Sequence, residues 1–174
     1  MPITSSNIGE YFSGGSGNTN PAASLGGVIS TTELTDNTTH NIWDQVSSAE
    51  SSAGDTEYRC IYVKNEHGSL TWQNAAVYIS SNTTATDTLV EIALGSSAIN
   101  ATEQTIANES TAPTLPGANG TNFSSAAGSG NALAIGNIPF GQSKAIWIKR
   151  VITAAAGATN DDTYVLAYVG DTSA

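Results

Sequence analysis

The chain has few charged side chains, and most of those it has are negative. Of its 174 residues only 11% are charged, with five Lys and Arg against fifteen Asp and Glu, for a formal net charge of −10. A protein that binds DNA or RNA neutralises phosphates with several Lys or Arg on one face. The composition therefore predicts no nucleic-acid partner, and it favours solubility over adhesion to polyanions.

Cysteine and long apolar runs are equally scarce. Cys60 is the one cysteine, so no disulfide forms within the chain, and its apolar neighbours predict a buried, inert thiol. No apolar run approaches the roughly 18 residues of a membrane-spanning helix, so we expect no membrane partner. The first residues also lack the basic and apolar regions of a secretory leader, and we expect none.

Patterns that carry chemistry are missing as well. His40 and His67 lie in different predicted turns, whereas a metal site needs several converging ligands. There is no Gly-x-Ser-x-Gly motif, phosphate-binding loop or dinucleotide fingerprint. Asp161 and Asp162 could contribute to a Ca²⁺ site, but adjacent Asp residues are more typical of turns. We therefore predict no catalytic, cofactor-binding or metal-binding residues, and a protein that is not an enzyme.

The sequence is rich in small polar residues, and its apolar residues recur at every second position in several segments. This alternation is typical of strands, and the short, Gly-rich connections leave no room for crossover helices. Seven to nine strands predict an all-β protein, an antiparallel β-sandwich of immunoglobulin-like or jelly-roll-like type, with a closed β-barrel as the alternative. The predicted strands cover 27–34, 56–65, 70–80, 88–95, 105–107, 132–138, 144–155 and 163–171, with a helical turn within 40–49.

The domain prediction divides the chain into two parts. Residues 1–26 are rich in Gly, Ser and Asn and predict an extended, flexible N-terminal arm, while 27–174 form a single sandwich with a long loop at about 95–130. Tyr11 and Phe12 form an aromatic pair that docks either on its own domain or on a neighbouring subunit. Several strands are apolar on both faces, so the loop, the arm or another subunit must cover the second face. This favours a homo-oligomer, for example a trimer.

Three of the five Lys and Arg residues, Lys144, Lys149 and Arg150, lie within residues 137–150. The alternation of side chains along the predicted strand determines whether they share one face. Alternation along the strand places Lys149 and Arg150 on opposite faces, so they do not make one basic patch. Glu91 is predicted to pair with Arg59, Lys149 or Arg150 across neighbouring strands. Together with Tyr11 and Phe12, Lys149 and Arg150 are our candidate contacts to a partner or subunit.

Three stretches carry a family resemblance. GDTEYRCIYVKNEHGSLTWQNAAVYIS and, later, IPFGQSKAIWIKR resemble virion structural proteins of tailed bacteriophages, as does EYFSGGSGNTNPAASLGG near the start. The likeness covers roughly residues 9–33 and 54–170. The VKN and IPFGQS turns also look like the strand layout of immunoglobulin-like modules, a pattern that many unrelated sandwiches share.

The resemblance implies a structural role in a virion, and within it a capsid decoration (cement) protein on the surface of the head. Its partners would be the major capsid protein and copies of itself. A tail or baseplate component is one alternative. A carbohydrate-binding or adhesion module is another, in which exposed Trp43, Trp72 and Trp147 would stack on sugar rings; three core tryptophans are the competing interpretation.

Overall fold

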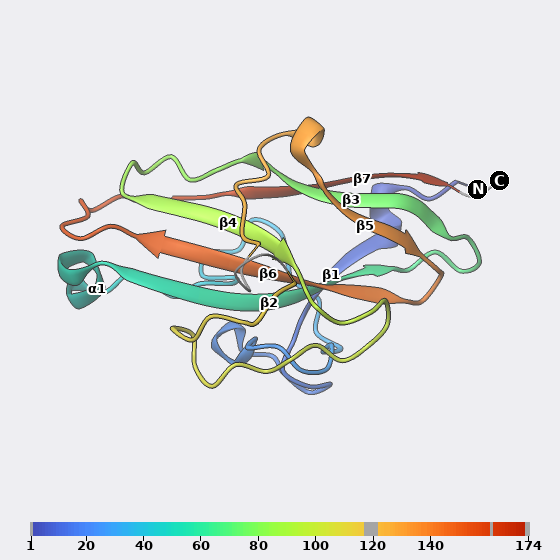
Figure 1. The fold of residues 1–174 in the computed structure, drawn as a ribbon, viewed down its shortest axis with the longest axis horizontal. Helices are drawn as coiled ribbons and strands as arrows, with labels where there is room; N and C mark the ends of the chain where they lie inside the picture. The colour runs from blue at the N-terminus through green and yellow to red at the C-terminus, as the bar shows by residue number, and fades with distance from the viewer. Residues whose placement is uncertain (1, 117–121, 161, 173–174) are drawn as a thin grey trace.

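The chain folds into a two-layer antiparallel β-sandwich, seen edge-on in Figure 1. The computed structural model describes residues 2–116, 122–160 and 162–172. One sheet has the strand order β1-β2-β6-β4 and the other the order β5-β3-β7, so both are open sheets and the β-barrel alternative does not apply to the described residues. The strands are β1 (Ile8–Phe12), β2 (Asp55–Asn65), β3 (Trp72–Ser81), β4 (Thr88–Leu94), β5 (Leu133–Ile138), β6 (Ser143–Ile152) and β7 (Val165–Thr172).

The prediction of an all-β sandwich is confirmed, and most strands lie where the alternation placed them. The predicted strands at 27–34 and 105–107 are wrong, because these segments form only isolated bridges with Tyr11 and Gly26. The helical turn begins later than predicted, as α1 (Ser48–Ala53), where the Ser47 hydroxyl and the Glu50 carboxylate form a capping box. In the part of the chain that the structure describes, no helix is long and apolar enough to cross a membrane.

The predicted flexible arm is wrong, because residues 1–26 contain a strand of the sandwich. β1 pairs antiparallel with β2 from Ile8↔Asn65 to Phe12↔Ile61. The other edge of β1 is also held, since the amide of Leu34 donates to the carbonyl of Glu10 at 2.7 Å. Gly and Ser richness marks the turns after β1 and not a free tail. A segment with ladder hydrogen bonds on one edge and loop hydrogen bonds on the other belongs to the fold.

The main core lies between the two sheets, where inward side chains alternate with outward ones as the pleat requires. The register Ile61↔Ile146 and Ile92↔Ile148 stacks branched side chains across three neighbouring strands. The buried residues of this inter-sheet core are Phe12, Leu34, Trp43, Ile61, Val63, Trp72, Ala75, Val77, Ile79, Val90, Ile92, Ala126, Ile138, Ile146 and Ile148.

A second apolar layer covers the outer face of the four-stranded sheet. Cys60 and Trp147, both 0% exposed, pack there under Ile106 and Leu115 of the long loop. Figure 1 shows the long loop, in yellow-green, and the segment that follows β1, in blue, on the side of the four-stranded sheet away from β3 and β7. Of the three covers that the sequence left open, the long loop and the N-terminal segment cover this face, and the predicted burial of Cys60 is confirmed.

The two long sides of the sandwich are closed differently. On the β4 side, residues 124–127 connect the sheets: the amide of Ile92 donates to the carbonyl of Ser124 at 2.9 Å, and that of Ile79 donates to the carbonyl of Ala126 at 3.1 Å. On the opposite side the edge strands are β1 and β7, and a cavity of about 630 Å³ lies between them.

Candidate functional site

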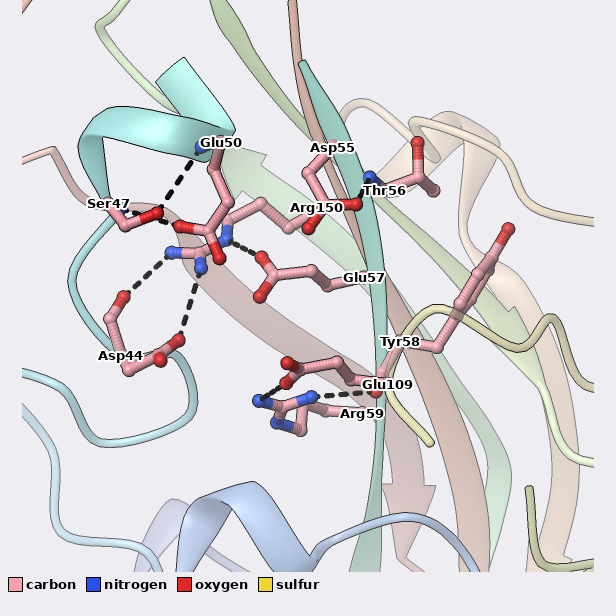
Figure 2. Close-up of polar contacts among 10 residues, drawn as sticks. All are labelled: Asp44, Ser47, Glu50, Asp55, Thr56, Glu57, Tyr58, Arg59, Glu109 and Arg150. Atoms are coloured by element: carbon pink, nitrogen blue, oxygen red, sulfur yellow. Dashed lines mark hydrogen bonds and ion pairs between the residues drawn. The ribbon is translucent and has the colours of Figure 1, made fainter. Parts of the chain in front are cut away.

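A cluster of charged residues, three of them buried, occupies the α1 end of the sandwich, and Figure 2 shows its members. Glu57 and Arg59 come from β2, Arg150 from β6, and Asp44 from the segment before α1. The register pairs Glu57 with Arg150, which places their side chains on the same face of the sheet. Because that face looks toward the other sheet, the ionic groups replace the apolar contacts that the rest of the inter-sheet core uses.

Arg150 is the centre of this cluster. Its Nε donates to the Oε2 of Glu57 at 2.5 Å, and its Nη1 donates to the main-chain carbonyl of Asp44 at 3.0 Å (Figure 2). Its Nη2 lies 3.5 Å from the Asp44 carboxylate. The Glu57 side chain is 0% exposed, so the guanidinium supplies the compensation that a buried carboxylate needs. The pair therefore fastens the 44–50 segment to the ends of β2 and β6.

A second guanidinium completes the arrangement. Arg59 forms an ion pair with Glu109 of the long loop. The indole of Trp43 lies between the two arginines, with its ring centre 5.1 Å from the Arg59 carbon Cζ and 4.9 Å from that of Arg150. Such contacts attract a cation to the face of the ring. The cluster thus joins two loops to two strands.

Three carboxylates of this region come close enough to consider a metal ion. One oxygen each of Glu50, Asp55 and Glu57 lies within 4.8 Å of the others. Hard cations such as Ca²⁺ prefer such oxygen ligands. Each carboxylate, however, already has a role: Glu50 accepts from the amide of Ser47, Asp55 from that of Thr56, and Glu57 from Arg150. The arrangement therefore fits a set of structural contacts.

Burial keeps the charged groups of the cluster away from any substrate. Burial raises the pKa of Glu57, against the opposing effect of the hydrogen bond from Arg150. A raised pKa in a cleft often marks a general acid. Because the Glu57 side chain is 0% exposed, a substrate would not reach it, and the shift follows from the fold. We interpret the cluster as a structural element.

The four predicted contact residues do not form one surface. Tyr11 and Phe12 are 9% and 5% exposed and pack on opposite faces of β1, within their own domain. Of the two docking options for this pair, the described chain therefore uses its own domain. Arg150 belongs to the buried cluster, and Lys149 forms an ion pair with Glu91 on the other face. The predicted pairing of Glu91 is confirmed, with Lys149 as the partner.

The remaining predicted residues also have structural roles. Asp162 accepts from the amides of Thr84 and Ala85 and from the hydroxyl of Thr88, so it holds the loop between β3 and β4 in place; Asp161 lies outside the described residues. The three tryptophans are 7%, 4% and 0% exposed, so Trp43, Trp72 and Trp147 present no stacking platform for sugars. The carbohydrate-binding or adhesion alternative was based on exposed tryptophans, and the structure does not support that basis.

Sequence reasoning missed the groove between β1 and β7. Glu10 of β1 and Tyr168 of β7 face each other there, and the Tyr168 hydroxyl donates to the Glu10 carboxylate. Glu33 and Asp36 lie on the rim, and Trp72 contributes to the wall. Burial raises the pKa of Glu10; the hydrogen bond from Tyr168 lowers it, and the negative charges of Asp36 and Glu33 add to the rise. No local signal could reveal this site, because its two sides are 158 residues apart in the chain.

Comparison with known proteins adds no name to these observations: no family model, curated protein or solved structure matches the chain.

Proposed function

We propose that the chain is a non-enzymatic structural protein of a bacteriophage virion, a decoration protein that binds the outside of the head and stabilises contacts between capsomers. The resemblance of its two strand motifs to phage virion proteins supports this role. The structural observation that carries the proposal is the outer face of the three-stranded sheet, which is open and apolar at its centre, with Asp171 as a charged residue toward one end.

The open face is built from small and branched side chains on three strands. The register aligns Ala134 of β5, Ala76 of β3 and Val169 of β7 in one row, and Tyr78 with Ala167 in the next. Val165 and Val169 are 49% and 38% exposed. The apolar centre of this face, on a chain with a net charge of −10, is a natural docking surface, since contact there desolvates few charged groups.

The geometry of such a face supports the decoration role. A rigid sheet presents its outward side chains at fixed spacing, which suits contact with a regular shell whose binding sites repeat. Weak contacts at each copy, repeated by symmetry, hold the protein on the particle without one strong site.

The decisive experiment locates the protein and disrupts the face. Gold-labelled antibody against the chain should decorate the heads of particles from the phage that encodes it, and Val165→Glu should abolish attachment to heads lacking the protein. Leu89→Glu is the matched control, because Leu89 is 43% exposed on β4 of the other sheet. Label confined to tails would favour the tail or baseplate alternative, and equal attachment of both variants would contradict the role of the open face.

A further inference from the structure

We infer that the groove between β1 and β7 binds a cationic side chain, Lys or Arg, carried on an extended segment of a different protein. The inference rests on the proposed function in one respect, since the segment would belong to a neighbour in the virion. It adds a second contact, on the side of the sandwich, to the open face of the three-stranded sheet.

The lining of the groove matches both parts of such a side chain. Apolar walls come from Ile8 of β1, Leu34, Trp72 and Leu166, and carboxylates come from Glu10, Glu33 and Asp36. Lys and Arg place their aliphatic stems along apolar surface while the charged head reaches polar groups. A cavity of about 630 Å³ is large enough for one such side chain with part of its main chain.

Charge complementarity identifies the occupant. Three carboxylates converge here, and no Lys or Arg is among the described residues that line the groove. The crowding already acts on Glu10, whose pKa is raised by burial and, to a smaller extent, by Asp36 and Glu33, against the hydrogen bond from Tyr168. A cation placed among them would relieve this repulsion.

A second copy of this chain does not supply that cation. All five of its Lys and Arg side chains are engaged within the chain. Four form ion pairs with carboxylates, and the ammonium of Lys144 donates to the carbonyl of Gly95 at 2.8 Å and to that of Ser97. The four ion-paired residues are Arg59, Lys64, Lys149 and Arg150. The occupant is therefore a different protein.

The strand beside the groove explains why the occupant is extended. β7 is an edge strand, so one side of its main chain is not paired with another strand of the sheet. Proteins usually protect such edges with Lys or Pro, and β7, with the sequence VLAYVGDT, has neither. An extended segment can add to the edge through main-chain hydrogen bonds, while its alternate side chains enter the groove.

A peptide titration tests the inference. The probe is acetyl-Thr-Val-Arg-Val-Thr-amide, and the control peptide replaces Arg by citrulline, which keeps the shape and removes the charge. In ¹H–¹⁵N spectra of the full chain, the Arg peptide should shift the amides of Leu166–Gly170 and Glu10, and the citrulline peptide should bind roughly tenfold more weakly. Equal binding of the two peptides, or shifts confined to other regions, would overturn the inference.

Variants of the groove carboxylates test whether these groups bind the Arg peptide. The combination of Glu10→Gln, Glu33→Gln and Asp36→Asn should weaken binding of the Arg peptide by roughly tenfold and remove most of its salt dependence. Glu50→Gln is the control, because it removes one charge from α1, at the opposite end of the sandwich in Figure 1, and Gln can still complete the capping box. Unchanged affinity in the triple variant would contradict the inference.

The two proposals fail separately. If wild type and the triple variant attach equally well to phage heads while Val165→Glu, outside the groove lining, does not, the groove inference is wrong and the decoration role stands. If the Arg peptide binds as described but the chain attaches to no head, the decoration role is wrong and the groove remains a cation site.

Discussion

The two sheets of the sandwich differ in what happens to their outer faces. The four-stranded sheet carries large side chains on that face, such as Tyr62 and Trp147, and the chain covers them with its own loops. The three-stranded sheet carries Tyr78, Ala167 and Val169 on that face and leaves them partly exposed. In one sheet the outer face contributes to stability, whereas in the other it is available for association. Four predictions test this division, from the largest expected effect to the smallest.

Loss of a side chain from the covered face should be the most damaging change. Trp147→Ala removes a fully buried indole and leaves a cavity under the loops, so we expect the free energy of unfolding to fall by about 4 kcal/mol. Urea denaturation measures it. Trp147→Phe should cost much less, because it keeps most of the volume and removes an indole N–H that lacks a partner among the described residues. Similar losses for Trp147→Ala and Val169→Ala would contradict the division between the sheets.

Replacing both residues of the buried Glu57–Arg150 ion pair by apolar side chains should destabilise the protein less than removing the charge of one residue. Glu57→Gln leaves the buried Arg150 guanidinium with the largely exposed Asp44 carboxylate as its remaining charged partner and should cost about 3 kcal/mol. The double variant Glu57→Leu and Arg150→Met replaces the pair by apolar volume and should recover most of that loss. Thermal unfolding of the single and double variants compares them. A double variant less stable than the single one would show that the pair itself is net stabilising.

Acid should loosen the cover of the four-stranded sheet. Burial tends to raise the pKa of Glu103, but hydrogen bonds from Ser97, Ser96 and Gln104 outweigh it and lower the pKa to about 2, from an ordinary 4.5. A depressed pKa contributes stability that is complete above pH 4.5 and is lost as the pH falls toward 2. We expect a loss on the order of 2 kcal/mol, seen first as faster amide exchange around Ile106.

Glu103→Gln isolates this contribution. The stability difference between wild type and the variant should be constant above about pH 5 and should shrink toward pH 2. Glu10 and Glu57, whose pKa values are raised, act in the opposite direction in both proteins and cancel in the difference. A difference that does not change with pH would contradict the assignment to Glu103.

The open face should be the most tolerant part of the molecule. Val169→Thr keeps the β-branched shape, and a partly exposed site should change the free energy of unfolding by less than about 0.5 kcal/mol. The same substitution at Val77, which is 0% exposed on the inner face of the same sheet, should cost roughly 2 kcal/mol. Similar costs at both sites would show that the outer face is not open in solution.

The sequence predicted most strands of the two sheets, but it missed the edge strand β1. Period-two alternation located β2, β3, β4, β6 and β7 and assigned Ile148 and Trp147 to opposite faces, because each strand carries its own pattern of burial. It failed for β1, whose five residues follow no clear alternation and take their strand geometry from pairing with β2. Composition alone suggested a flexible arm, and tertiary hydrogen bonds decided otherwise.

The candidate sites were less accessible to sequence reasoning. The sequence predicted that Glu91 pairs with a cation of a neighbouring strand, and the structure identifies Lys149 among the three candidates. The cluster of Glu57, Arg59 and Arg150 needed the register between β2 and β6, and the groove needed β1 and β7 to lie at the same side of the molecule. Neither can be read from local spacing, since the contacts join residues about a hundred or more positions apart.

The strand order also has a kinetic consequence. β6, near the end of the chain, pairs with both β2 and β4, and β7, the last strand, pairs only with β3. Neither sheet can be completed from neighbouring segments, so folding must close long loops before native contacts form, and a rate in the millisecond-to-second range is expected. On the ribosome both sheets stay incomplete until the final strands emerge, which leaves β3 with its edges unpaired for most of synthesis.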